Sequence, residues 1–573
     1  MSKSSPSRLA RRGRRGLRLN WIVTSVPPRT RRGMVLGASG AAIAMALVFT
    51  PMPAFSQQEC GAPAGGAVTC DAADADFPTF ANGITYAVED LTVTLGAGID
   101  VNTAETTAID LSAPAGGTMT LYTDDQTDYV TITAAGATAV SVSAGTVDIQ
   151  APSIYGTADN QTGIYAESIA PTNGDITIET SVIDLSGADT TGVNAVATSG
   201  NITVDAVDDY IATTGAGIVA ATTTGDILVT TYDVEVTTAG AGEAIDLTTD
   251  GGNATAYVFG YTGGASTAGT GPAISVETGA TGGDAYVLAT QVSSAGDDAV
   301  VVTAAAGTAR AIVLTSNGGD VRVEATDGTS SADSQGGAVA SSFMSDAYAT
   351  GTNITTTGND APGVAANASG DGSAYAYAYG TVDTSGTGSD GVYSSAIGGT
   401  GNATVYSTAD ITTTGDDASG IRTNSAGGDI TVTTGGVITV EGDLAGGGTA
   451  RADGIFALSE SPTATVTINA TGNIYVSGAA GYGVNVDSDG AAVSLDLADV
   501  EATGTGGVAV NLIAAGSGLV EVSAANILAD QTGVSIVGED NEIDLTVTGT
   551  LANGQMARRY GLPQRVMLGS TSN

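Results

Sequence analysis

The sequence predicts an all-β fold, a right-handed parallel β-helix of about 16 rungs, from three observations. Small residues dominate: 573 residues include 82 Gly but only seven Phe and one Trp. Apolar and polar residues alternate in short runs, and one phrase of sequence recurs along the chain. A narrow stack of small aliphatic residues needs few large aromatic rings to fill its interior.

The alternation indicates strands. Runs such as Ile202-Thr203-Val204 and Val466-Thr467-Ile468 place apolar side chains on one face and threonines on the other. Valine, isoleucine and threonine also favour strands. Clusters of Gly, Asn and Asp follow each run after a few residues, so helices of useful length are excluded.

The recurring phrase is a short strand, a Thr/Gly/Asp turn, a second strand that opens on Gly or Ala plus Ile or Val, another turn, and a third strand. Asp410 to Val432, DITTTGDDASGIRTNSAGGDITV, is one copy. We expect successive copies to stack directly on one another, with loops of varying length absorbing the uneven spacing. The residues that open the second strand are Ile109, Val140, Ile164, Val193, Ile218, Ile245, Ile274, Val300, Val339, Val364, Val392, Ile421, Ile455, Val484, Val508 and Val534.

The charges divide the chain into two parts. Residues 1–56 contain ten Lys and Arg and no acidic residue. From Gln57 onward there are seven Arg and all 60 Asp and Glu, a net charge of −53. Such a surface repels nucleic acid and anionic lipid and attracts cationic partners.

The first 56 residues are typical of an export signal with a long basic region. An apolar stretch from Met34 to Phe49 follows Arg31 and Arg32 and is shorter than a membrane-spanning helix. Small residues at Ala54 and Ser56 predict cleavage between Ser56 and Gln57. We therefore expect export through the inner membrane, to the cell surface or beyond it.

Two cysteines, Cys60 and Cys70, follow the predicted cleavage site. In an oxidising compartment we expect them to form a disulfide near the first end of the solenoid. A metal-binding pair is the alternative, but the chain contains no His and no third Cys. We expect residues 57–100 to form an N-terminal cap, residues 101–550 the β-helix repeats, and residues 551–573 an atypical tail, truncated or frame-shifted.

Most catalytic chemistry is excluded by composition. Without His, and without Lys after Lys3, the mature chain has no Ser-His-Asp triad, histidine metal site or lysine nucleophile. The carboxylate pairs Asp124-Asp125, Asp208-Asp209, Asp297-Asp298 and Asp416-Asp417 are the remaining reactive groups, and turn chemistry explains them. No catalytic residue and no bound cofactor are therefore predicted.

Two further features suggest binding. Ser385 to Tyr393, SGTGSDGVY, approximates one calcium-binding repeat with Asp390 as a candidate ligand; an ordinary turn is the alternative, and we expect diffuse calcium stabilisation instead. Tyr375, Tyr377 and Tyr379 alternate and share one face of a strand. We expect an inward stack or simple strand propensity there, with an exposed sugar- or protein-binding stripe as the alternative.

The export signal, the cysteine pair and the repeats, including NGITYAVEDLTVTLGAGIDV at Asn82–Val101, resemble the adhesin-like passenger region of a classical (type V) autotransporter. The resemblance implies attachment to host or cell-surface glycans or proteins, or self-association. It also implies an outer-membrane translocator, which nothing after Thr550 could build. Two alternatives stay open: a β-helical polysaccharide-degrading enzyme, and a calcium-binding surface-layer protein.

Overall fold

The computed structural model describes residues 60–71, 80, 83–96, 98–123, 130–151, 153–237, 242–260, 264–281, 283–295, 298–313, 320–326, 329–330, 336–343, 345–443, 452–489, 492–515, 518–538, 542–552, 556–559 and 564–568. Residues 56–573 form one structural unit. The predicted signal segment and the Ser56–Gln57 cleavage site lie outside the described residues.

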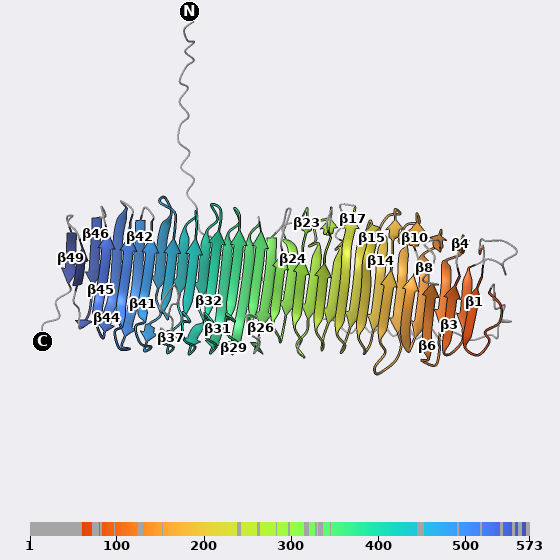
Figure 1. Ribbon diagram of the computed structural model, residues 1–573, viewed down its shortest axis with the longest axis horizontal. Coiled ribbons are helices and arrows are strands. Elements are labelled where there is room, and N and C mark those ends of the chain that lie inside the picture. Colours follow the sequence, from red (N-terminus) through yellow and green to blue (C-terminus); the bar gives the residue numbers. More distant parts are fainter. Residues whose placement is uncertain are drawn as a thin grey trace, which may run out of the picture. The chain divides into compact units, whose positions relative to one another are not determined.

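The predicted fold class is confirmed: the described residues form strands and no helix, and the strands stack as a parallel β-solenoid (Figure 1). The predicted right-handed winding stays a prediction. Figure 1 shows strands of successive turns lying side by side from β1 to β49. Two ladders of strands run along the whole stack, and two shorter ladders each occupy part of it.

The long A ladder pairs each strand with the next in parallel. Its strands are β1 (Ala67–Cys70), β3 (Leu91–Leu95), β6 (Thr118–Thr123), β9 (Thr146–Ala151), β12 (Ile176–Thr180), β15 (Ile202–Thr213), β17 (Ile227–Val236), β19 (Ala254–Val258), β22 (Ala285–Ala289), β25 (Ala309–Val313), β28 (Ala338–Phe343), β30 (Val364–Ser369), β32 (Val392–Ile397), β35 (Ile421–Ser425), β38 (Ile455–Ser459), β41 (Tyr482–Ser488), β43 (Val508–Ala514), β45 (Thr532–Gly538) and β48 (Met556–Arg559).

The long B ladder is built in the same way. Its strands are β2 (Ile84–Ala87), β5 (Thr107–Ser112), β8 (Thr138–Ala144), β11 (Thr162–Ser168), β14 (Thr191–Ala197), β16 (Ala216–Thr222), β18 (Ile245–Thr249), β21 (Ile274–Thr278), β24 (Asp298–Ala304), β26 (Asp320–Thr326), β29 (Ala347–Thr356), β31 (Ala374–Thr384), β33 (Ala403–Ser407), β36 (Ile430–Thr434), β39 (Thr465–Ala470), β42 (Ala492–Ala502), β44 (Leu519–Ala529), β46 (Glu542–Val547) and β49 (Gln564–Leu568).

The third side of the turn changes place along the solenoid. In the first block it is the short A ladder: β4 (Asp100–Thr103), β7 (Thr131–Ala134), β10 (Ser153–Gly156), β13 (Ile183–Leu185), the second halves of β15 and β17, β20 (Ala265–Thr267) and β23 (Val292–Ser294). In the second block it is the short B ladder: β27 (Thr329–Ser330), the second halves of β29 and β31, β34 (Asp410–Thr413), β37 (Ile438–Val440), β40 (Ile474–Val476), the second halves of β42 and β44, and β47 (Leu551–Ala552).

The predicted stacking of the sixteen strand-opening residues is correct only in part. Those from Ile109 to Val300 pair in register within the long B ladder. Val300 then pairs with Val321, whereas Val339 pairs with Arg310 and Ala365 in the long A ladder. Val508 is also out of step, because Val510 is the residue that pairs with Val484 and Val534.

The strand-opening residues change from the long B ladder to the long A ladder because of one additional strand. Loops of varying length were expected to absorb the uneven spacing, and for the 39-residue interval between Val300 and Val339 this expectation is wrong, because the interval contains β26 as well as β25. One inserted strand shifts every later copy of the phrase by one side of the turn. The strands that open on Gly plus Ile or Val therefore move from the long B ladder to the long A ladder.

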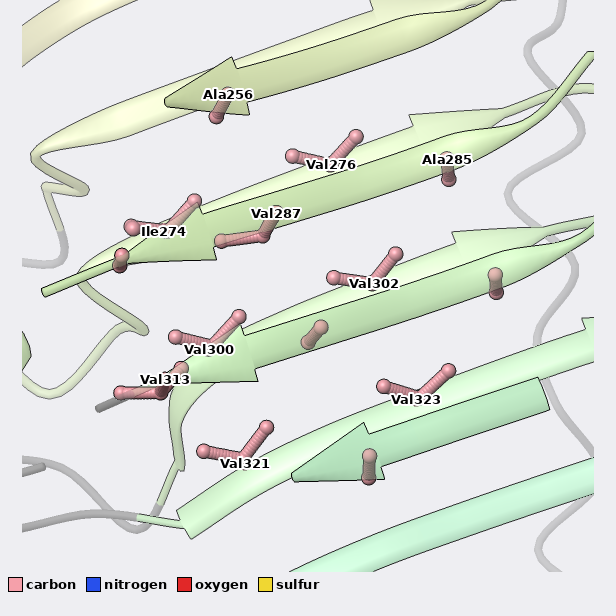
Figure 2. Close-up of a cluster of buried hydrophobic side chains, with 14 of the residues drawn as sticks. Ala256, Ile274, Val276, Ala285, Val287, Val300, Val302, Val313, Val321 and Val323 are labelled. Carbon is pink, nitrogen blue, oxygen red and sulfur yellow. The ribbon is translucent and has the colours of Figure 1, made fainter. Parts of the chain in front are cut away.

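The core consists of inward ladders of small aliphatic side chains. Figure 2 shows Ile274, Val300 and Val321 above one another, and Val276, Val302 and Val323 beside them. All six are at most 1% exposed. Burial of each such side chain contributes on the order of 1.5–3 kcal/mol, which opposes the entropic cost of ordering the chain.

The glycine before the strand-opening residue has a packing reason. A Cβ on Gly391 would lie 2.4 Å from Cγ2 of Ile411 and 2.6 Å from the carbonyl oxygen of Gly420 on the next turn. The close approach of successive turns thus requires glycine at this position.

Both ends of the described stack contain paired strands. In the stretch expected to form a cap, β1 pairs with β3 and β2 pairs with β5. Cys60 and Cys70 form a disulfide, with their Cα atoms 4.7 Å apart. In the stretch expected to be an atypical tail, β47, β48 and β49 pair in parallel with β44, β45 and β46.

Candidate binding surface

The alternating tyrosines of β31 point outward. Ala374, Ala376 and Ala378 are at most 1% exposed, and Tyr375 and Tyr377 between them are half-buried on the outer face. The expected inward stack is therefore wrong. The interior admits Ala, Val and Ile between closely spaced sheets, so the larger phenol rings occupy the opposite face of the same strand.

Neighbouring turns add further tyrosines to this face. Register pairs Tyr375 with Tyr348 on β29 and pairs Tyr377 with Tyr406 on β33. Tyr379 and Tyr406 are 36% and 41% exposed. We call Tyr348, Tyr375, Tyr377, Tyr379 and Tyr406 the tyrosine patch; it spans three consecutive turns of the long B ladder.

The rings of the patch are ordered by the spacing between turns. Tyr348 and Tyr375 stack with centroids 4.6 Å apart and planes 7° from parallel. Tyr379 and Tyr406 lie 6.3 Å apart and are tilted by 54°. Since adjacent parallel strands are separated by about 4.8 Å, rings at paired positions fall naturally at stacking distance.

An arginine extends the stack by one turn. The Arg322 guanidinium carbon lies 4.8 Å from the ring centroid of Tyr348. Arg322 Nη2 also lies 3.1 Å from Asp298 Oδ1, so a carboxylate, a guanidinium and two phenol rings follow one another over four turns. Stacking between a cation and an aromatic face is favourable, more so where water is partly excluded.

Two phenols of the patch, Tyr377 and Tyr379, remain protonated in neutral solution. Burial raises the pKa of Tyr377, and the neighbouring phenols Tyr375 and Tyr379 raise it further. Burial also raises the pKa of Tyr379, followed by the effects of Tyr406 and Glu324. The hydroxyls can therefore both donate and accept hydrogen bonds.

A second group of aromatic side chains lies on the long A ladder. Tyr257 stacks on Phe259 with centroids 6.1 Å apart and contacts Tyr286 edge to face at 5.9 Å. The Arg310 guanidinium lies 5.7 Å from the Tyr286 ring. These rings are half-buried against one another.

Asp390, the candidate calcium ligand, lies in a buried structural environment. Its Oδ1 accepts a hydrogen bond from the amide of Ser419 at 2.7 Å, and its Oδ2 lies 3.8 Å from Nη1 of Arg422. Burial raises the pKa of Asp390 to about 6, although Arg422 and the Ser419 amide both lower it. Among the described residues, no group of three or more His, Cys, Asp or Glu is placed to hold a metal ion.

The turn carboxylates bind the next turn of the solenoid rather than their own. In one column each side-chain Oδ1 accepts the backbone N–H of the residue one turn later, at 2.7–2.9 Å. We call this column the Asx ladder; its members in order are Asp175, Asn201, Asp226, Asn253, Asp284 and finally Thr308, which donates both its amide and its hydroxyl to Asp284. Charged and neutral acceptors alternate, so no two of its carboxylates lie on adjacent turns.

The carboxylate pairs considered for catalysis are not brought together as a site. Asp124 and Asp125, the side chains of Asp208 and Asp209, and Asp297 lie outside the described residues. Asp298 pairs with Arg322, and Asp416 accepts the amide of Asp443 at 3.0 Å.

Sequence reasoning missed an acidic group on the long B ladder. Burial raises the pKa of Glu243 to about 7, and repulsion from Asp246 adds to the effect. Burial also raises the pKa of Asp246, with a further contribution from Glu277 on the next turn. Register pairs Asp246 with Ser275, so Glu277 lies diagonally across on the next strand; the sequence does not show this proximity, since 31 residues separate Asp246 from Glu277.

Comparisons with known proteins add no relative. No protein-family model, curated protein or solved structure matches this chain. Within the described ranges, there is also no helix with the length and apolar character needed to cross a membrane.

Proposed function

We propose that this chain is an exported, non-catalytic, adhesin-like solenoid similar to an autotransporter passenger, which attaches to cell-surface glycans or proteins or to other copies of itself. The basic first 56 residues and the acidic remainder support export. The parallel β-solenoid is compatible with a passenger-like region. Its described strands offer a long, regular outer surface.

One observation supports the binding role above all: five tyrosines gather on the outer face of three consecutive turns. Tyrosine presents a rigid apolar ring with a polar tip, and such side chains are favoured in binding surfaces. The chain has only 19 Tyr, seven Phe and one Trp, so this concentration differs from the surrounding surface of Thr and Ser.

The absence of catalysis is part of the proposal. It is supported by the turn carboxylates of Asp175, Asp226 and Asp416, which accept backbone N–H groups of the next turn at 2.7–3.0 Å. Glycoside hydrolysis would instead require two carboxyl groups facing a substrate at a set separation.

Attachment of coated beads to cells tests the proposal. Beads bearing the purified chain are expected to bind cells or to aggregate, and the variant Tyr375→Thr/Tyr377→Thr/Tyr379→Thr is expected to lose most of this binding. The matched control is Tyr122→Thr/Tyr155→Thr/Tyr210→Thr, which removes three exposed tyrosines outside the patch. Equal attachment by the two triple variants would reject the patch as the adhesive surface.

A further inference from the structure

One face of the Tyr375 ring has a stacking partner and the opposite side faces a small residue. Tyr348 stacks on the first face at 4.6 Å. On the other side, register pairs Tyr375 with Thr404 of the next turn. The column continues with Thr431 and Thr467, so the ring stack ends at Tyr375 within this described ladder. Tyr406, two residues after Thr404 on β33, stands exposed beside this step.

Elsewhere in the chain, an arginine guanidinium occupies the position one turn away from an aromatic ring. Arg310 lies one turn after Tyr286 with its guanidinium 5.7 Å from the ring, and Arg322 lies one turn before Tyr348 at 4.8 Å. Arg422 lies between Tyr393 and Phe456, on the preceding and following turns, at 5.6 and 5.9 Å. Three arginines thus stack on aromatic rings one turn away. A planar guanidinium suits this spacing better than a compact ammonium group.

The surrounding charge favours a cation at this step. Residues 345–443 contain eleven acidic residues and one basic residue, Arg422, whose guanidinium is next to Asp390. At the position next to the Tyr375 ring, the paired residue is Thr404, whereas Arg310, Arg322 and Arg422 occupy the corresponding positions beside the other rings. A negative surface with this composition draws basic segments toward it.

We propose that the tyrosine patch binds a basic protein segment by inserting an arginine side chain against the face of Tyr375, over Thr404 and beside Tyr406. This names the partner class for the attachment surface and so rests on the proposed function. The guanidinium would extend the column of Arg322, Tyr348 and Tyr375 by one turn. A neutral glycan could use the ring face but would gain no charge–charge attraction from the surrounding carboxylates.

The test uses the full purified chain and two peptides of equal charge, nona-arginine and nona-lysine, with binding measured by calorimetry at two salt concentrations. We expect nona-arginine to bind about fivefold more tightly than nona-lysine, as a stacked guanidinium requires. Tyr375→Leu is expected to remove most of that preference, and Tyr375→Phe, which retains the ring, to preserve it.

A pair of charge-matched variants isolates the position. Thr404→Arg places the chain's own guanidinium against Tyr375 and is expected to abolish the arginine preference. Thr467→Arg makes the same change of charge two turns further along the column and is expected to retain it. Hydrogen exchange across β31 and β33 confirms that each variant keeps its strands.

The opposing outcomes are distinct. Equal affinity for the two peptides, or equal behaviour of Thr404→Arg and Thr467→Arg, would overturn the inference, because only general electrostatic attraction would remain. If a glycan array shows patch-dependent sugar binding while the arginine preference is absent, the inference fails and the attachment role stands. If the unaltered chain shows neither bead attachment nor a preference for nona-arginine, the proposed function fails as well.

Discussion

The alternation of charged and neutral members in the Asx ladder predicts the effect of Asn253→Asp. Asn253 lies between Asp226 and Asp284 in this column. Its amide donates to Asp226 Oδ1, and its Oδ1 accepts a hydrogen bond from the amide of Asp284. An aspartate at position 253 can still accept the Asp284 amide. The substitution therefore adds charge repulsion without removing a hydrogen bond.

The magnitude follows from the spacing of the turns. Like charges about 4.8 Å apart in a water-like environment repel by about 0.9 kcal/mol for each pair, and the new carboxylate has two such neighbours. The cost is therefore about 2 kcal/mol at low ionic strength and about 1 kcal/mol at 0.15 M salt, where screening removes roughly half. All three positions are exposed, so the higher estimates for buried charges do not apply.

Local hydrogen exchange is the appropriate assay, because a stack of repeats opens locally rather than as one unit. Peptides covering β19 and β22 should exchange about 30-fold faster in Asn253→Asp than in wild type at low salt, and about fivefold faster at 0.15 M salt. Asn253→Ala, which loses the acceptor without adding charge, should show a cost that does not depend on salt. The reasoning is refuted if Asn253→Asp matches wild type at low salt, or if added salt leaves its effect unchanged.

Four further predictions follow from the core, the buried acid, the disulfide and the surface charge. Val302→Ala should destabilise β24 and its neighbours by about 2 kcal/mol, whereas Val301→Ala on the outer face should cost less than about 0.5 kcal/mol, as hydrogen exchange will measure. The folded-state pKa of Asp390, about 6, lies above its value of about 3.9 in an unfolded chain. Ionised Asp390 therefore destabilises the fold above pH 6, and this cost disappears below about pH 4. Asp390→Asn should flatten the dependence of stability on pH between these values, and an unchanged dependence would contradict the assignment. Reduction of the Cys60–Cys70 disulfide should speed exchange in β1 and β3 and leave the strands beyond the first few turns unaffected. Millimolar calcium should raise the melting temperature relative to chelator, since cations relieve repulsion such as that among Glu243, Asp246 and Glu277; identical melting temperatures would contradict it.

The short-range pattern of the sequence was sufficient to predict strands, turns and inward faces. The alternation at Ile202 and Val204 placed these residues in the core, where both are 0% exposed. The recurrence of one phrase predicted parallel stacking, because each copy can bury its apolar face only against the next. These inferences depend on local periodicity, which the sequence states directly.

The exchange of sides near β26 could not be predicted in the same way. The phrase has the same order of strands before and after Val300, so nothing within one copy states which ladder it joins. Only the count of strands in the interval before Val339 decides this, and Asp320–Thr326 was concealed by the assumption of a long loop.

The tyrosine patch could not be predicted in full for a related reason. Alternation placed Tyr375, Tyr377 and Tyr379 on one face, but it assigns neither face to the interior. The alanines between them decide the matter, since a narrow interior selects the smaller side chain. The contributions of Tyr348, Tyr406 and Arg322 depend on pairing between turns and are visible only in the register.

Cysteine crosslinking across the exchange point tests the stacked register most directly. The chain's two cysteines are joined to each other, so introduced thiols react without interference. Register places Thr303 beside Glu324 and Ile312 beside Ser341. Rapid crosslinking by a short thiol reagent in Thr303→Cys/Glu324→Cys and in Ile312→Cys/Ser341→Cys, with none in Thr303→Cys/Ser341→Cys, is the predicted result. Crosslinking of the third pair alone would show that β24 and β28 stack in one ladder, and would contradict the two-block solenoid.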